Sequence, residues 1–458
     1  MHLLRRLAAI PMLCLLAACA APPATPPATP PGSIDAAAEG LPPMQRFGPT
    51  RAAPPSRSNA DMARDFLDLG FLMESGRALP RLTRFEGPVG ISVQPGAPAT
   101  LGRDLDDLLV RLRREAGIDI RRLPDGSPTQ IVVATPSRAQ LKAQVPEAAC
   151  FVVPNVGTWE EFLRQRSSRA TDWTQVERRV RVAVFIPGDV SPQEMRDCLH
   201  EEIAQALGPL NDLFRLPDSV FNDDNMHTVL TGFDMLMLRA WYSPEMAGSP
   251  TREEAAAALP GLLARLNPRG ARLPPEGLPP TSRDWIDAVK SALGPRGSTA
   301  ARQREAARAL AIARAAGWRD TRLGFSWYVV GRLAVEDDPD AALVAFGNAH
   351  ALYRRALGAD SIQAANVAMQ LAAFALLADN SEAALALVDE SLPAARETQN
   401  AALLATLLFV RAEALARQDR ENAAQAARVD SLGWARYGFG TAEAAELGRI
   451  RPARRLRL

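Results

Sequence analysis

The sequence predicts an α+β domain with a mixed sheet and one long helix, followed by an all-α domain of helical repeats. Four short runs rich in β-branched residues lie among helical patterns between residues 60 and 270. From 281 to 445 the composition turns to Ala, Leu and Arg with helical periodicity. The chain has 458 residues, 47% hydrophobic and 23% charged, which suits a globular protein of about two to four domains.

The first 18 residues have the features of an export signal. Arg5 and Arg6 precede an apolar run over 7–16, which is too short to span a bilayer as a mature helix. The sequence Leu-Ala-Ala-Cys ending at Cys19 then resembles the lipobox of bacterial lipoproteins. The resemblance implies cleavage before Cys19 and acylation of this residue, with the bilayer as a partner. A plain secretory signal with an incidental cysteine is the alternative, and it also implies export.

We therefore expect the folded domains in the cell envelope, in the periplasm or at the surface. Ala20, rather than Asp, follows the cysteine and favours the outer membrane. Loss of Arg5 and Arg6 with the signal leaves 51 basic and 52 acidic residues. This balance disfavours nucleic acid as a partner.

Residues 19–59 are rich in Pro and Ala and have no apolar periodicity. Such a composition favours an extended, disordered tether that holds the folded part away from the membrane. A loop packed on a domain is the alternative.

The elements of the first domain, 60–270, follow from their patterns. Short apolar runs predict strands, and leucines at helical spacing predict helices. Ser191 and Pro192 suit a helix start, with Glu194 completing a capping box, and Gly208 suits its end. In chain order we expect a helix over 61–76, a strand over 89–93, a helix over 101–116, strands over 131–134, 150–153 and 180–186, and a helix from 191 to 207.

The most informative segment is HEEIAQALGPLND over 200–212. It resembles the zinc helix of zincin metalloproteases, HExxHxxGxxH/D, in which two histidines four residues apart bind zinc and the Glu activates water. Aligned on Gly208, Glu202 takes the place of the general base. Glu201 and Gln205 stand at the two histidine positions, and Asn211 or Asp212 at the third ligand. His200 lies one residue out of register.

The resemblance therefore implies a zincin-like domain without catalytic zinc, and we expect no cofactor. One alternative is a buried helix with a glycine stop. Another is a working metal site with unusual ligands and Glu202 as base; that set is Glu201, Gln205, Asp212 and His227. A calcium site is a further alternative, built from Glu201, Asp212, Asp223 and Asp224. His200 and His227 are expected as hydrogen-bonding residues.

Downstream residues extend this resemblance. Ser219-Val220-Phe221 is similar to the Ser-Ile-Met turn under the metzincin zinc, with Phe221 in place of Met. The segments ACFVVP, SVFNDDN and DMLMLRAWYSPEM together resemble DUF2927, a family of uncharacterised and often lipoprotein proteobacterial proteins. This resemblance covers about 60–270 and implies no activity.

Cys150 and Cys198 are the only cysteines of the mature chain besides Cys19. Export into an oxidising compartment predicts a disulfide between them. Two buried free thiols are the alternative.

The second domain begins after a Pro/Gly-rich linker over 271–280. Three acidic turns, each followed by an Ala-Ala pair, recur at 337–342, 379–384 and 419–424. This pattern resembles tetratricopeptide (TPR) repeats with a longer period, and stacked helix pairs of that kind bind peptides or proteins. A self-contained helical bundle is the alternative. Residues 446–458 form a basic tail.

We therefore expect a lipid-anchored envelope protein that is non-catalytic. Its zincin-like domain would bind a ligand, and its repeats would recruit a protein or peptide partner. The alternative is a metallopeptidase-like hydrolase with nonstandard ligands and Glu202 as general base.

Overall fold

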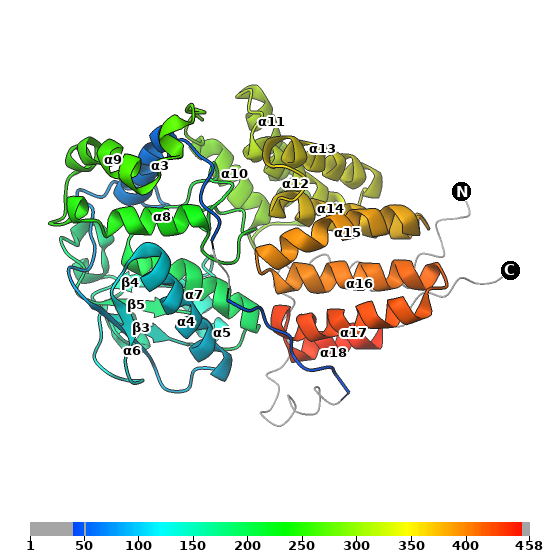
Figure 1. Ribbon diagram of the computed structural model, residues 1–458, viewed down its shortest axis with the longest axis horizontal. Helices are drawn as coiled ribbons and strands as arrows, with labels where there is room; N and C mark the ends of the chain where they lie inside the picture. The colour runs from blue at the N-terminus through cyan, green and yellow to red at the C-terminus, as the bar shows by residue number, and fades with distance from the viewer. Residues whose placement is uncertain (1–39, 50–51, 451–458) are drawn as a thin grey trace. The chain divides into compact units, whose positions relative to one another are not determined.

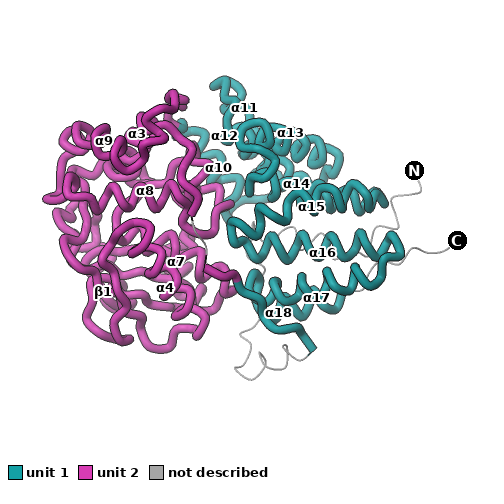
Figure 2. The backbone as a smooth tube through the Cα atoms, viewed as in Figure 1, with its two compact units in different colours: residues 1–46, 281–458 teal, residues 47–280 magenta. Residues whose placement is uncertain are grey.

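The computed structural model describes residues 40–49 and 52–450. Cys19, the expected signal and residues 19–39 of the tether lie outside the described residues, as does the end of the tail, 451–458. The chain divides into two compact units, 1–46 with 281–458 and 47–280 (Figure 2). Across the described residues, every helix is too short or too polar to traverse a bilayer.

The unit 47–280 is built on a five-stranded mixed sheet in the order β2-β1-β3-β5-β4. All neighbouring strands are parallel except β4, which runs antiparallel to β5 at the sheet edge. The four expected strands are confirmed, and β2 is an addition. The bounds are Val89–Val93 (β1), Ile120–Arg122 (β2), Ile131–Ala134 (β3), Phe151–Pro154 (β4) and Val182–Phe185 (β5).

The two faces of the sheet have separate apolar cores. Alternation along β5 sends Val182 and Val184 into the main core, and Ala183 and Phe185 into the opposite one. The main core is shared with α4 (Ala99–Arg111) and α7 (Pro192–Leu207), which also pack on each other (Figure 1). The opposite core is an aromatic cluster with α6 (Trp159–Gln165).

The other helices of this unit are α3, α5, α8 and α9, with a π-helical turn, η2, directly after α4. In α3, Ser58 caps the first turn through the amide of Asp61. In α8, Thr231 and Asp234 form a capping box. The bounds are Asn59–Phe71 (α3), Leu112–Ala116 (η2), Arg138–Gln144 (α5), Gly232–Trp241 (α8) and Arg252–Leu266 (α9).

Helix α7 begins where the sequence predicts. The Ser191 hydroxyl accepts a hydrogen bond from the Glu194 amide at 3.1 Å, and Pro192 occupies the first turn. The expected capping box is not completed, because the Glu194 carboxylate forms an ion pair with Arg138 instead.

At the other end of α7, buried groups satisfy the carbonyls that have no partner within the helix. The Arg179 guanidinium donates to the carbonyls of Gln205, Ala206 and Gly208. The chain leaves the helix at Gly208 with extended φ, so no left-handed conformation requires glycine there. A Cβ at this position would lie 2.9 Å from the Trp241 ring. The glycine is therefore needed for close packing.

A disulfide joins Cys150, next to β4, to Cys198 on α7, with a Cα–Cα distance of 6.0 Å. The expected pairing is confirmed. The bond links the antiparallel edge of the sheet to the helix that carries the HEEIAQALGPLND segment.

The helical part of the other unit contains nine helices within the described residues. Consecutive helices pack on each other, so the region consists of stacked antiparallel helices. The bounds are Arg283–Leu293 (α10), Thr299–Ala315 (α11), Thr321–Ala334 (α12), Pro339–Leu357 (α13), Ile362–Leu377 (α14), Ser381–Glu397 (α15), Ala401–Arg417 (α16), Glu421–Gly438 (α17) and Thr441–Arg449 (α18).

The three repeated acidic turns connect α12 to α13, α14 to α15 and α16 to α17. The second alanine of each pair, at 342, 384 and 424, is buried. A small side chain at this point lets the second helix lie close to its neighbours. The repeat in the sequence therefore marks equivalent helical hairpins.

Two expected boundaries need correction. Residues 41–46, expected in the free tether, pack on α17. The Gln45 amide nitrogen donates to the carbonyl of Gly433, and Arg436 donates to the Pro42 carbonyl. Residues 446–449, expected in the tail, continue α18 because Leu447 is buried.

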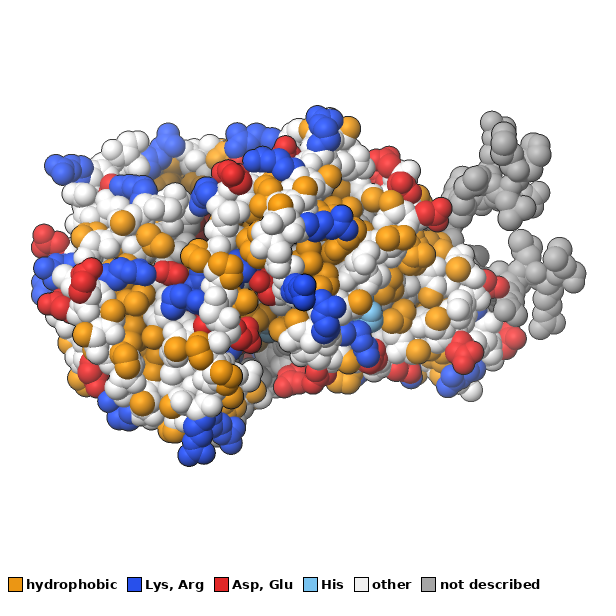
Figure 3. Space-filling view, turned by 90° about the horizontal axis from the view of Figure 1, so that it is seen from above, with side chains coloured by type: hydrophobic (Ala, Val, Ile, Leu, Met, Phe, Trp, Pro, Cys, Tyr) orange, Lys and Arg blue, Asp and Glu red, His pale blue; other side chains and the backbone are white. Residues whose placement is uncertain are grey.

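The visible surface mixes charged and hydrophobic side chains (Figure 3). Among large apolar residues, Val344 on α13 and Val180 before β5 are exposed to nearly the same degree, 62% and 61%. A single exposed apolar side chain is normal for a globular protein, but Val344 lies next to a second one, Leu343.

Replacing both Cys150 and Cys198 by Ala should lower the free energy of unfolding. The disulfide closes a loop with a sequence separation of 48, for which the loss of unfolded-state entropy gives at most about 4 kcal/mol. Thermal and urea unfolding with and without reductant measure this loss. Reductant should destabilise the wild type and leave the double variant unchanged. Equal sensitivity of both proteins would contradict the prediction.

Candidate functional site

The second half of α7 presents a cluster of carboxylates. Glu201 and Glu202 follow Cys198 by three and four residues, so they lie near it on the helix surface. One oxygen of each carboxylate and the Cys150 sulfur lie within 4.8 Å of one another. The disulfide therefore borders this carboxylate pair.

Three further carboxylates come from other segments. Glu74 follows α3, Asp212 follows α7, and Asp223 lies in the loop before α8. One oxygen from each lies within 4.8 Å of the other two. The charges of Glu74 and Asp223 also act on Glu201. We refer to Glu74, Glu201, Glu202, Asp212 and Asp223 as the acidic cluster.

Glu202 is the deeply buried member of this cluster. Its side chain is 2% exposed, and its Oε2 atom has no hydrogen-bond partner. An ionised carboxylate in such a position is costly because it has lost water without gaining a donor. This group needs either a proton or a bound cation.

The pKa values of the α7 carboxylates reflect this environment. Burial raises the pKa of Glu201 to about 8, with repulsion from Glu74, Asp223 and Asp197. Burial, together with the charges of Glu201 and Glu74, raises the pKa of Glu202 well above its usual value. The charges with the largest effects on these two groups are negative, so the cluster has the electrostatics of a cation site.

Both nearby histidines are bound to the backbone. His200 Nδ1 accepts a hydrogen bond from the Leu230 amide at 3.1 Å. His227 Nε2 lies 2.9 Å from the Pro217 carbonyl oxygen, to which it donates. Burial lowers the pKa of both imidazoles, and Arg111 and Arg196 lower that of His200 further. Their geometry is that of structural hydrogen-bonding residues.

The residues at the zinc-motif positions have different surroundings. Asn211 donates its side-chain amide to the Asp68 carbonyl at 2.9 Å, which turns it toward α3. Gln205 is buried on α7. The structure brings Glu201, Glu202 and Asp212 into the acidic cluster and supplies oxygen atoms only. A tetrahedral nitrogen site of the zincin type is not assembled.

Comparison with known proteins gives one family. Residues 59–261 match the model of the family described as "Protein of unknown function (DUF2927)". The match supports the assignment of this segment to DUF2927. No curated protein matches the chain. Among solved structures, the crystal structure of BtubC (BKLC) from P. vanneervenii aligns over 49% of this chain and 76% of its own, with 13% identity and a TM-score of 0.28, too low to carry an argument about fold.

Within the DUF2927 segment, the Ser219-Val220-Phe221 turn is a buried structural element. Asp234 accepts hydrogen bonds from the Ser219 hydroxyl and from the amides of Val220 and Thr231. Phe221 is fully buried. The turn therefore holds the start of α8 and the entrance to the loop that carries Asp223.

Asp224, one of the expected calcium ligands, faces its own loop. Its carboxylate accepts hydrogen bonds from the Met226 amide at 3.1 Å and the Asn222 side chain at 3.1 Å. Asn222 also donates to the Leu216 carbonyl at 2.7 Å. These bonds fix the loop and leave Asp223, rather than Asp224, in the acidic cluster.

Sequence reasoning missed Glu74. It precedes α7 by more than a hundred residues and sits in a turn closed by a hydrogen bond from the Gly76 amide to the Met73 carbonyl. No sequence motif marks this turn. Asp65 and Asp68 on α3 bind residues of the 211–215 segment, and this packing brings Glu74 to the cluster.

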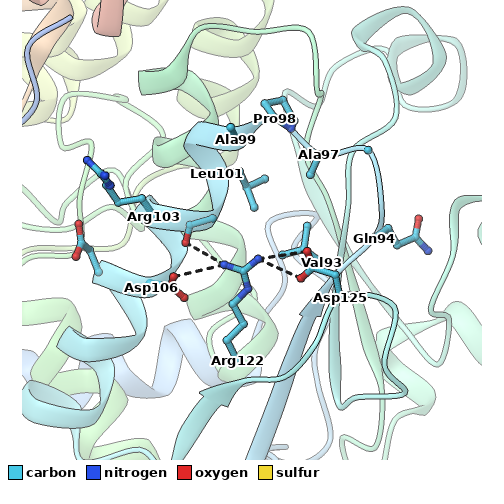
Figure 4. A pocket seen from close by; sticks show the side chains of 13 residues that line it. Val93, Gln94, Ala97, Pro98, Ala99, Leu101, Arg103, Asp106, Arg122 and Asp125 are labelled. Atoms are coloured by element: carbon cyan, nitrogen blue, oxygen red, sulfur yellow. Dashed lines mark hydrogen bonds and ion pairs between the residues drawn. The ribbon is translucent and has the colours of Figure 1, made fainter.

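A separate pocket of about 470 Å³ lies at the carboxyl end of β1, next to the start of α4 (Figure 4). Its central cation, Arg122, forms ion pairs with Asp106 and Asp125. The guanidinium is thereby neutralised within the pocket. The acidic cluster remains the stronger candidate site.

The raised pKa values predict that the metal-free protein loses stability as pH rises. Folded Glu201 and Glu202 hold a proton at pH values where the unfolded chain, with pKa near 4.5, has released it. The free energy of unfolding should fall between about pH 6.5 and pH 8, by up to about 1.4 kcal/mol per pH unit for each group. This pH range lies above the one in which the two buried histidines titrate. Their lowered pKa values make the free energy of unfolding rise with pH, which is the opposite trend.

Urea unfolding in chelator over this range measures the slope. Glu202→Gln should reduce it because an amide does not titrate, whereas Glu160→Gln on the exposed face of α6 should retain it. Identical slopes in the wild type and Glu202→Gln would show that folded Glu202 is already ionised.

Proposed function

We propose that this protein is a non-catalytic scaffold of the bacterial cell envelope, anchored by an acylated Cys19. The observation that carries the proposal is the chemistry of the HEEIAQALGPLND helix. Glu201 and Gln205 occupy the places of the two zinc-binding imidazoles, while His200 is committed to the backbone. Gln is a poor zinc ligand, since its neutral oxygen suits harder cations.

A zincin-like ancestry of the DUF2927 segment is part of the proposal. Support comes from the mixed sheet with an antiparallel edge strand, and from the helix that the disulfide ties to that edge. In this interpretation the segment retains the architecture of a peptidase and uses it to bind a ligand without cleaving it.

The proposed role of the helical unit is to recruit a polypeptide partner. Stacked helical hairpins of the TPR type present extended surfaces on which peptides bind. Leu343 and Val344 are adjacent exposed apolar side chains on α13. Such side chains are suited to desolvated contacts at the centre of an interface.

Metal analysis and peptidase assays test the absence of catalysis. Purified protein should contain substoichiometric zinc and should not cleave casein or peptide libraries above the level of Glu202→Gln. Stoichiometric zinc, with cleavage that Glu202→Gln abolishes, would establish instead the metallopeptidase with Glu202 as general base.

Partner binding is tested in the full-length protein by crosslinking in cells. Val344→Glu should reduce capture of its partner about tenfold, equivalent to about 1.4 kcal/mol, because a charge would be desolvated in an apolar contact. Val180→Glu is the matched control, since Val180 is equally exposed in the other unit. Equal capture by both variants would remove the support for α13 as the binding surface.

A further inference from the structure

The acidic cluster has the composition of a hard-cation site. Its five members contribute only carboxylate oxygens, and they come from three separate parts of the chain: the turn after α3, α7 with its exit, and the loop before α8. Repulsion among such groups opposes folding unless something positive lies between them.

A second observation points to a ligand independently of the number of acidic residues. Glu202 is 98% buried, and its Oε2 atom has no hydrogen-bond donor. The same carboxylate lies within 4.8 Å of Glu201 at the inner side of the cluster. Buried polar atoms are almost always paired in folded proteins, so an unpaired oxygen on a carboxylate next to that of Glu201 marks a place for a cation.

We propose that the acidic cluster binds one calcium ion, with Glu74, Asp212 and Asp223 as ligands and Glu201 and Glu202 completing the oxygen shell from α7. Calcium takes six to eight oxygen ligands at about 2.3–2.6 Å in flexible geometry. Oxygens on opposite sides of the ion are then about 5 Å apart. The oxygens of Glu74, Asp212 and Asp223 lie within 4.8 Å of one another, as do those of Glu201 and Glu202, so each group fits inside that span. The two groups are neighbours, because the charges of Glu74 and Asp223 act on Glu201.

Calcium fits this set better than zinc or magnesium. Zinc prefers nitrogen and sulfur ligands, and the two nearby imidazoles are turned to backbone groups. The neighbouring sulfur of Cys150 is bonded to that of Cys198 and provides no thiolate. Magnesium requires a compact octahedron and retains several waters, so it seldom uses a site made largely of carboxylates.

Binding would add a further link between segments that are distant in the sequence. Asn222 and Asp224 fix the loop that carries Asp223, and the disulfide fixes α7 beside Glu201 and Glu202. A calcium ion between them would hold the turn at Glu74 against both. The site therefore stabilises the DUF2927 segment, and it is independent of the proposed anchoring and partner binding.

The test uses the mature full-length protein, with calcium chloride alone as the ligand, in isothermal titration and thermal unfolding at pH 7.5. At a calcium concentration about a hundredfold above Kd, the wild-type Tm should rise by about 5 °C or more. Glu202→Gln and Asp223→Asn should each weaken calcium binding at least tenfold. Glu160→Gln, outside the cluster, should bind as the wild type does.

Thermal unfolding in chelator shows whether Glu202 is a calcium ligand or only a structural residue. Without calcium, Glu202→Gln should unfold at the same Tm as the wild type or above it, because an amide does not have to hold a proton that the unfolded chain has released at this pH. A structural role alone would lower the Tm equally in chelator and in calcium. If Glu202→Gln does not fold, the calcium affinity of Asp223→Asn still tests the proposal, because Asp223 lies in a loop and is only half-buried.

Three results would overturn the proposal. These are no calcium binding by the wild type at millimolar concentration, unchanged affinity in both cluster variants, and tight zinc binding at these residues that calcium does not displace. Failure of calcium binding leaves the scaffold proposal standing. Zinc with Glu202-dependent cleavage would overturn both, so the two failures are distinguishable.

Discussion

The buried guanidinium of Arg179 fixes the direction of α7, and the candidate site depends on it. Burial lowers the pKa of Arg179 only to about 10, so it remains a cation at neutral pH. Its charge meets the carbonyl end of a helix, where a cation is favourable, and its face lies over the Trp173 ring at 4.8 Å. Because these contacts satisfy the last turn of α7, the chain can leave the helix abruptly at Gly208.

The direction in which the chain leaves α7 at Gly208 determines where Asn211 and Asp212 lie. The Trp241 ring packs against Gly208, and the Tyr242 hydroxyl donates to the Leu207 carbonyl at 3.0 Å. The chain is directed toward α3, where Asn211 binds the backbone and Asp212 reaches the acidic cluster. The fold thus brings carboxylate oxygens together beside the end of α7. What this place can do chemically follows from these side chains rather than from the fold around them.

Sequence reasoning located the elements whose signals are local. The β-branched runs became strands, Ser191 and Pro192 began α7, and the two cysteines paired. It missed β2, because only Ile120 of its three residues is buried and no alternating pattern arises. Glu74 and Arg179 were also missed, since each acts on residues distant in sequence. The part of the site on α7 was therefore predictable, and its partners from other segments were not.

The stacked hairpins have a consequence for how the helical unit unfolds. Each helix packs chiefly on the helices next to it in the chain, from α10 to α18. Stability in such an array is a sum of local terms and nearest-neighbour interfaces. The terminal helix α18, which packs chiefly on α17, should fray before the central pairs. Unfolding of this region should then begin at its ends and proceed toward the central pairs.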